Sequence, residues 1–133
     1  MQQHIKNLWA HKNTKYFRVG LYAYTVLLFV ATLTPLGYLK DDSPGWLSSF
    51  SFEHFDKVVH FLMFFFMGIF LYLSFRLQKI SYFYIPFLTG ILIEILQHYI
   101  PTGRTFDVWD ILADGLGALL AYFLLPKKGL KAH

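Results

Sequence analysis

Residues Glu94–Asp114 read EILQHYIPTGRTFDVWDILAD and are the most informative part of the sequence for the fold. Pro101 and Gly103 indicate a turn between two apolar helical segments, and ionisable side chains occur on both sides of it. An ionisable group is unfavourable inside a bilayer, so such residues in membrane-spanning sequence are functional candidates. The stretch therefore predicts a membrane helix hairpin with a functional site near its turn.

The composition indicates one all-α, polytopic membrane domain. Of the 133 residues, 56% are hydrophobic and 15% are charged, whereas soluble domains average about 25% charged. A soluble core of this size could not bury so much apolar surface, so we expect lipid to cover the excess. The net charge is +4, and its basic residues cluster near the chain ends, which favours membrane lipids and not nucleic acid as partners. The absence of Cys excludes disulfides and thiolate metal sites.

Four apolar runs are long enough to cross a hydrocarbon core of about 30 Å. They are Val19–Leu39, Val58–Phe75, Ile80–Ile100 and Val108–Leu125, and a polar loop covers 40–56. We therefore predict a four-helix transmembrane bundle over 19–125, between a basic N-terminal segment, 1–18, and a basic tail, 126–133.

The distribution of Lys and Arg predicts the orientation of this bundle. The side that carries both termini has four in the N-terminal segment, two in the 76–79 connection and three in the tail, or nine in all, against three on the other side. The positive-inside rule then places both termini in the cytoplasm and the acidic residues near the outer face.

The start of the second span carries the first candidate side chains. Asp56 and His60 are four residues apart and share a helix face, and Lys57 is a neighbour of His60. The alternative is that Asp56 and Lys57 lie among lipid headgroups while His60 only bonds a neighbouring helix. On the third span, Glu94, Gln97 and His98 share a face, and a protonated Glu94 that merely links two helices is the corresponding alternative.

The fourth span carries Asp107, Asp110 and Asp114, which fall within about 60° of one another at roughly 100° per residue. Asp107 suits a helix N-cap and Asp110 the acidic third position of a capping box, so capping alone could explain both. Asp114 lies about 10 Å further along the helix, at a depth similar to that of Glu94. We therefore expect Glu94 and Asp114 to face one another.

Small residues beside this acidic face, Ala113, Gly117 and Ala121, predict close packing against another helix.

The charges of this outer site do not balance. The predicted site has two positive charges, on Lys57 and Arg104, and its net charge is −3 if the histidines are neutral. Its five carboxylates are those of Asp56, Glu94, Asp107, Asp110 and Asp114. Like charges cannot all remain ionised at low dielectric. Either some carboxyls or histidines carry protons, or a divalent cation is bound, with Glu94, Asp110 and Asp114 as candidate metal ligands. Oxygen-rich sites with an occasional imidazole suit Mg²⁺, Mn²⁺ or Ca²⁺.

These residues, in their order and spacing, resemble the VanZ-like family. The motifs that carry the resemblance are Asp56-Lys57-x-x-His60-Phe61, Glu94-x-x-Gln97, Arg104, and Asp107-x-x-Asp110-x-x-x-Asp114-Gly115-x-Gly117. The resemblance implies a small, multi-pass protein of the bacterial inner membrane, from a family associated with resistance to the glycopeptide teicoplanin. Asn is more usual in that family at the position of Asp114, so the charge of the site differs here.

Three functions remain open from the sequence. In the first, an outward-facing pocket binds or moves an anionic or lipid-linked cell-envelope molecule, with Glu94 and Asp114 as proton carriers. Four helices are few for alternating access, so transport would require a homo-oligomer.

The second function is that of an intramembrane enzyme acting on a phospholipid or lipid-linked precursor. His60, Glu94 and Asp110 are then the candidate catalytic residues, while Arg104 and Lys57 stabilise phosphate charge. The third is that of a structural or partner protein whose charges only fix the packing of the helices.

Overall fold

The computed structural model describes residues 14–34, 52–101, 103 and 105–126. In these ranges the regular secondary structure consists of α-helices, namely α2 (Thr14–Leu33), α4 (Phe52–Ser74), α5 (Ser81–Tyr99) and α6 (Val108–Leu124). The all-α prediction is confirmed for this part of the chain. Two segments, Thr14–Leu33 and Phe55–Ser74, are long and apolar enough to cross a membrane.

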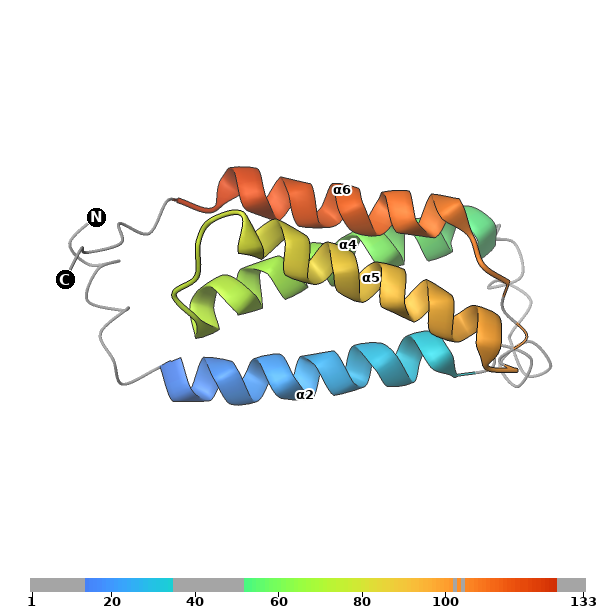
Figure 1. Ribbon diagram of the computed structural model, residues 1–133, viewed down its shortest axis with the longest axis horizontal. Coiled ribbons are helices and arrows are strands. Elements are labelled where there is room, and N and C mark those ends of the chain that lie inside the picture. Colours follow the sequence, from blue (N-terminus) through green and yellow to red (C-terminus); the bar gives the residue numbers. More distant parts are fainter. Residues whose placement is uncertain (1–13, 35–51, 102, 104, 127–133) are drawn as a thin grey trace.

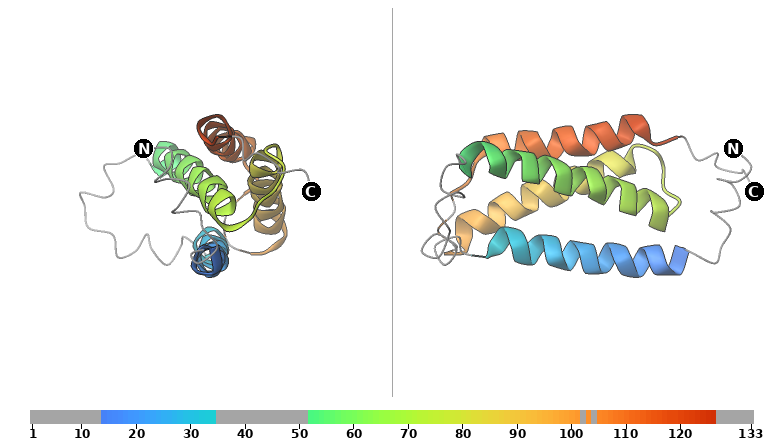
Figure 2. Two further views of the ribbon diagram at one scale, coloured as in Figure 1. Left: turned by 90° about the vertical axis from the view of Figure 1, so that its left-hand side faces the viewer. Right: turned by 180° about the vertical axis from the view of Figure 1, so that it is seen from behind.

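The four helices lie along one long axis, and each runs antiparallel to the helix before it in the chain (Figure 1). The start of α2, the end of α4, the start of α5 and the end of α6 lie at one end of the molecule, hereafter the basic end. The start of α4, the end of α5 and the start of α6 lie together at the opposite end, hereafter the polar end (Figure 2).

The first two helices begin earlier than predicted. α2 starts at Thr14 and ends at Leu33, whereas the predicted span was Val19–Leu39, of which 35–39 lies outside the described residues. α4 starts at Phe52, inside the predicted polar loop over 40–56. Charged residues limit the part of a helix that lipid can cover, but they do not end its backbone hydrogen bonding, so hydropathy misses these turns. The last two helices match their predicted spans to within one residue.

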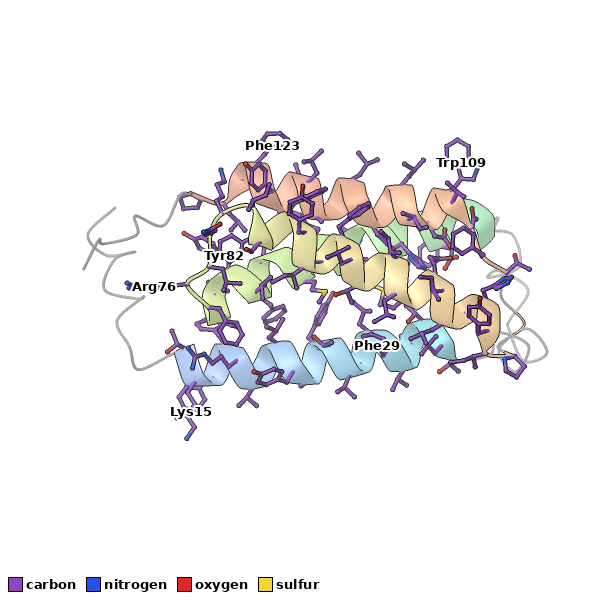
Figure 3. The ribbon with its side chains drawn as sticks, viewed as in Figure 1. Lys15, Phe29, Arg76, Tyr82, Trp109 and Phe123 are labelled. Atoms are coloured by element: carbon purple, nitrogen blue, oxygen red, sulfur yellow. The ribbon has the colours of Figure 1, made fainter. Side chains whose placement is uncertain are left out.

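The bundle has a narrow core and an apolar exterior. One buried cluster consists of Leu28, Phe64, Met67 and Ile93, and a second, nearer the basic end, contains Tyr72 and Tyr82. Large apolar side chains are also exposed on every helix, for example Leu27 on α2 and Phe123 on α6, which points away from the bundle (Figure 3).

Glycine allows α6 to approach α4 closely enough to bring their polar residues together. α6 packs more extensively against α4 than against α5. A Cβ atom at Gly117 would clash with the backbone of Phe61 and Phe65, and one at Gly68 would lie 2.8 Å from the Cβ of Ala121. The small residues Gly117 and Ala121 are therefore interface residues between these helices.

Candidate functional site

Ionisable side chains from three helices meet at the polar end. Those that contact one another are Asp56, Lys57 and His60 of α4, Glu94 of α5, Asp107 at the N-cap of α6, and Asp110 and Asp114 of α6. This set is hereafter the acid–histidine cluster. Its members lie far apart in the sequence and are brought together by the antiparallel packing of the helices.

Lys57 joins α4 to α6 at the accessible rim of the cluster. Its ammonium Nζ lies 3.0 Å from Asp107 Oδ2 and 3.2 Å from Asp110 Oδ1. The side chains of Lys57 and Asp107 are 32% and 35% exposed, whereas that of Asp110 is 8% exposed. Partial burial raises the pKa of Asp107, but hydrogen bonds from Lys57 and from the Trp109 amide outweigh it and hold that pKa below its ordinary value.

His60 lies deeper in the cluster and is only 1% exposed. Its Nδ1 is 2.9 Å from Asp114 Oδ1, which is hydrogen-bond distance. Its Nε2 lies 3.9 Å from an oxygen of Asp56 and 3.9 Å from an oxygen of Asp110. Each ring nitrogen therefore faces carboxylate groups.

Glu94 caps the start of α6 from the neighbouring helix. The backbone N–H of Asp107 donates to Glu94 Oε2 at 3.1 Å, and the N–H of Trp109 donates to Asp107 Oδ1 at 2.8 Å. The predicted N-cap role of Asp107 is thus confirmed. The carboxylate expected to complete the capping box was that of Asp110, but the structure gives this bond to Glu94, while Asp110 accepts a hydrogen bond from Lys57.

Two carboxylate oxygens inside the cluster are buried and have no hydrogen-bond partner among the residues that the structure describes. They are Glu94 Oε1 and Asp114 Oδ2, and both residues are 0% exposed. Asp114 fits against Gly90 of α5, where an added Cβ atom would lie 2.5 Å from Oδ2. Gly90 was not among the residues predicted from the sequence, although a glycine one turn before Glu94 was the available signal.

The side chains of the cluster form two overlapping groups with metal-ligand spacing. Each of the three residues in a group offers one ligand atom, and these atoms lie within 4.8 Å of one another. One group is Asp56, His60 and Asp110, and the other is His60, Glu94 and Asp114. The structure therefore brings Glu94 and Asp114 to the same imidazole.

The remaining candidates from the sequence are placed differently. Gln97 is buried, and its Nε2 donates to the backbone carbonyl of Thr32 at 2.8 Å, which ties α5 to α2. Because this partner is a carbonyl group, no side chain in the sequence signals the contact. Arg104 lies outside the described residues.

Comparison with known proteins identifies one family. The model of the VanZ/LLP1 family matches residues 2–129, nearly the whole chain, as the sequence motifs predicted. No curated protein and no solved structure matches the chain.

Proposed function

Because the chain belongs to the VanZ/LLP1 family, we propose that it is a four-span protein of the bacterial cytoplasmic membrane. Membership of this family suggests a membrane protein linked to glycopeptide resistance. The four helices have 20, 23, 19 and 17 residues, and at 1.5 Å per residue they measure about 26–35 Å. That range matches a hydrocarbon core of about 30 Å, and the apolar side chains exposed on all four helices support lipid as their surroundings.

The distribution of charge supports cytoplasmic termini. Lys15 and Arg76 both lie at the basic end (Figure 3), and Arg18 and Lys79 belong to the same end, where Arg18 donates to the Ser74 carbonyl. Lys57 is the basic residue that the described ranges place at the polar end. By the positive-inside rule the basic end faces the cytoplasm, and the polar end then lies near the outer leaflet.

At the polar end the protein binds the anionic headgroup of a lipid or lipid-linked envelope molecule. The observation that carries this proposal is the position of Lys57 at the rim, partly exposed and held between two carboxylates. A phosphate could replace Asp107 or Asp110 as the partner of this ammonium, because charge-assisted bonds to either anion are comparable in strength. The buried interior of the cluster would lie beneath the bound headgroup.

The enzyme hypothesis receives no comparable support from the geometry. His60 is almost completely buried, and each of its ring nitrogens faces carboxylates. A substrate would have to displace one of these groups before His60 could accept a proton from it. Headgroup binding, with or without movement of the ligand across the membrane, displaces a carboxylate only from Lys57 at the partly exposed rim and leaves the surroundings of His60 unchanged.

Headgroup binding is testable with the full-length protein in nanodiscs. Undecaprenyl phosphate is the probe, native mass spectrometry measures its occupancy, and phosphatidylcholine is the neutral control lipid. We expect Lys57→Gln to weaken binding at least about tenfold, the equivalent of one charge-assisted hydrogen bond, and Lys57→Arg to retain most of it. Lys79→Gln, which removes the same charge at the basic end, serves as the matched control.

Two outcomes would contradict the proposal. Wild-type occupancy in Lys57→Gln would exclude the rim as the headgroup site. An equal loss of undecaprenyl phosphate binding in Lys79→Gln would show that the effect depends only on the overall charge of the protein. In a teicoplanin-sensitive host, expression of the wild type is expected to raise the inhibitory concentration, and Lys57→Gln is expected to abolish that rise.

A further inference from the structure

In the part of the chain that the structure describes, each of the two innermost carboxylates bonds to the protein through one oxygen, and its other oxygen has no partner. Glu94 Oε2 accepts the Asp107 amide, and Asp114 Oδ1 pairs with His60, while Glu94 Oε1 and Asp114 Oδ2 are buried and unpartnered. Buried charges in proteins are normally paired or bound to metal. We propose that His60, Glu94 and Asp114 bind one divalent first-row cation, Mn²⁺ or Zn²⁺.

The distances within this group suit a single ion. Bonds from such ions to imidazole nitrogen and carboxylate oxygen are about 2.0–2.2 Å, so ligand atoms around one ion lie up to about 4.4 Å apart. The ligand atoms of His60, Glu94 and Asp114 are within 4.8 Å of one another, and the nitrogen and oxygen of His60 and Asp114 are 2.9 Å apart. The limit of 4.8 Å exceeds the separation around one ion by about 0.4 Å, which side-chain rotation can close, and an ion on Nδ1 would replace the hydrogen bond between His60 and Asp114.

The charges favour the same group. A divalent cation with two carboxylates is neutral, which lowers the free energy of keeping Glu94 and Asp114 ionised in a buried site. One imidazole with two carboxylates is a ligand set for Mn²⁺ or Zn²⁺. When Nδ1 of His60 binds the ion, its Nε2 lies 3.9 Å from an oxygen of Asp56 and 3.9 Å from an oxygen of Asp110. Approach of either oxygen to hydrogen-bond distance would give the carboxylate support that is usual for a metal-bound imidazole.

The other group, Asp56, His60 and Asp110, is less suited to the ion. Asp110 already accepts a hydrogen bond from the ammonium of Lys57, so part of its charge is compensated. Within the described ranges neither Glu94 nor Asp114 contacts a Lys or Arg side chain. The proposed ligands therefore differ from the three suggested by the sequence, with His60 in the place of Asp110.

The test measures Mn²⁺ binding to the full-length protein in detergent after removal of metal with EDTA. Electron paramagnetic resonance gives the free Mn²⁺, and displacement by Zn²⁺ gives the relative affinity. We expect one ion per chain in the wild type. Glu94→Gln and Asp114→Asn are each expected to weaken binding by at least about tenfold, since even changes to supporting residues have effects of that size.

Asp107→Asn is the matched control for charge. It removes one negative charge from the same end of the bundle, but Asp107 belongs to neither group of potential ligands. A second pair of variants changes no charge. Gly90→Ala would push Asp114 aside and weaken binding, whereas Gly20→Ala, whose Cβ atom would meet only Phe70 at 3.7 Å, would not.

Several results would overturn the assignment. Absence of Mn²⁺ and Zn²⁺ binding by the wild type would mean that protons or water satisfy the two oxygens. An equal loss in Asp107→Asn would indicate a general charge effect. Retention of binding in Glu94→Gln and Asp114→Asn, with loss in Asp56→Asn, would move the ion to the other group. The metal alone is the probe, so none of these outcomes depends on whether a headgroup binds at Lys57.

Discussion

The carboxylate of Asp107 divides its two oxygens between two different helices. One oxygen accepts the Trp109 amide and caps α6, while the other pairs with Lys57 of α4. Asp107 therefore acts as the N-cap of α6, as its position in the sequence suggested, and it also links α6 to α4. At this scale, a capping function and membership of the cluster do not exclude one another.

Asp107 predicts a pH dependence of stability. Its pKa is lower in the folded protein than its ordinary value, so its stabilising contribution is present above the unfolded-state pKa. The contribution is lost as the pH falls through the folded-state pKa, because the unfolded chain then binds the proton more readily. We expect the melting temperature of the wild type in detergent to fall more steeply below about pH 4 than that of Asp107→Asn. Asn retains the N-cap, so parallel curves for the two proteins would refute this account.

The pairing of individual residues was the part of the site that the sequence could least predict. Helical periodicity identified which carboxylates share a face, because that depends only on spacing along one helix. It could not predict that Lys57 pairs with Asp107 and Asp110, or that the Asp107 amide donates to Glu94. These contacts depend on the rotation and axial offset of neighbouring helices, which side-chain packing along the whole interface determines.

At the scale of the helices, Gly117 determines how closely α4 and α6 approach. Gly117→Ala would place a methyl group against the backbone of Phe61, which cannot move without separating the helices. We expect it to destabilise the protein by about 1–3 kcal/mol, the usual effect of overpacking, measured by unfolding in mixed micelles with increasing SDS.

Gly115→Ala, two residues away on α6, is the control for this prediction. Its Cβ atom would meet the Phe87 ring at 3.1 Å, and a side chain can move where a backbone cannot. Its loss of stability is expected to be smaller than that of Gly117→Ala. Ala favours a helix over Gly at both positions, so equal losses would show that the Phe61 backbone restricts the substitution no more than the Phe87 ring does.

The extent of each helix was predictable where apolar sequence and helix coincide, as in α5 and α6. It was not predicted at 52–55, where α4 begins inside the expected polar loop, although the shared face of Asp56 and His60 already implied helix at Asp56. This difference matters for the site, because the extra turns give Asp56 and Lys57 fixed helical positions opposite α6.

For the whole molecule, the separation of a basic end from a polar end makes the orientation testable. The chain has no native Cys, so single cysteines can report sidedness directly. Gln78→Cys lies between α4 and α5 at the basic end, and Thr105→Cys lies just before α6 at the polar end, both at exposed positions.

In intact spheroplasts we expect a membrane-impermeant maleimide to label Thr105→Cys at once and Gln78→Cys only after permeabilisation. Labelling of both from the outside would contradict four spans with cytoplasmic termini. The reverse labelling pattern would show that the protein has the opposite orientation, with the acid–histidine cluster on the cytoplasmic side.

The bond between Glu94 and the amide of Asp107, which are 13 residues apart, also bears on biogenesis. A ribosome delivers α5 before α6, so the acceptor for this amide is already in place when α6 emerges. The opening turn of α6 acquires its second cap only after docking on α5. In the proposed four-span topology the two helices should therefore enter the bilayer as a hairpin, and a fragment that begins at Asp107 would fray at its first turn.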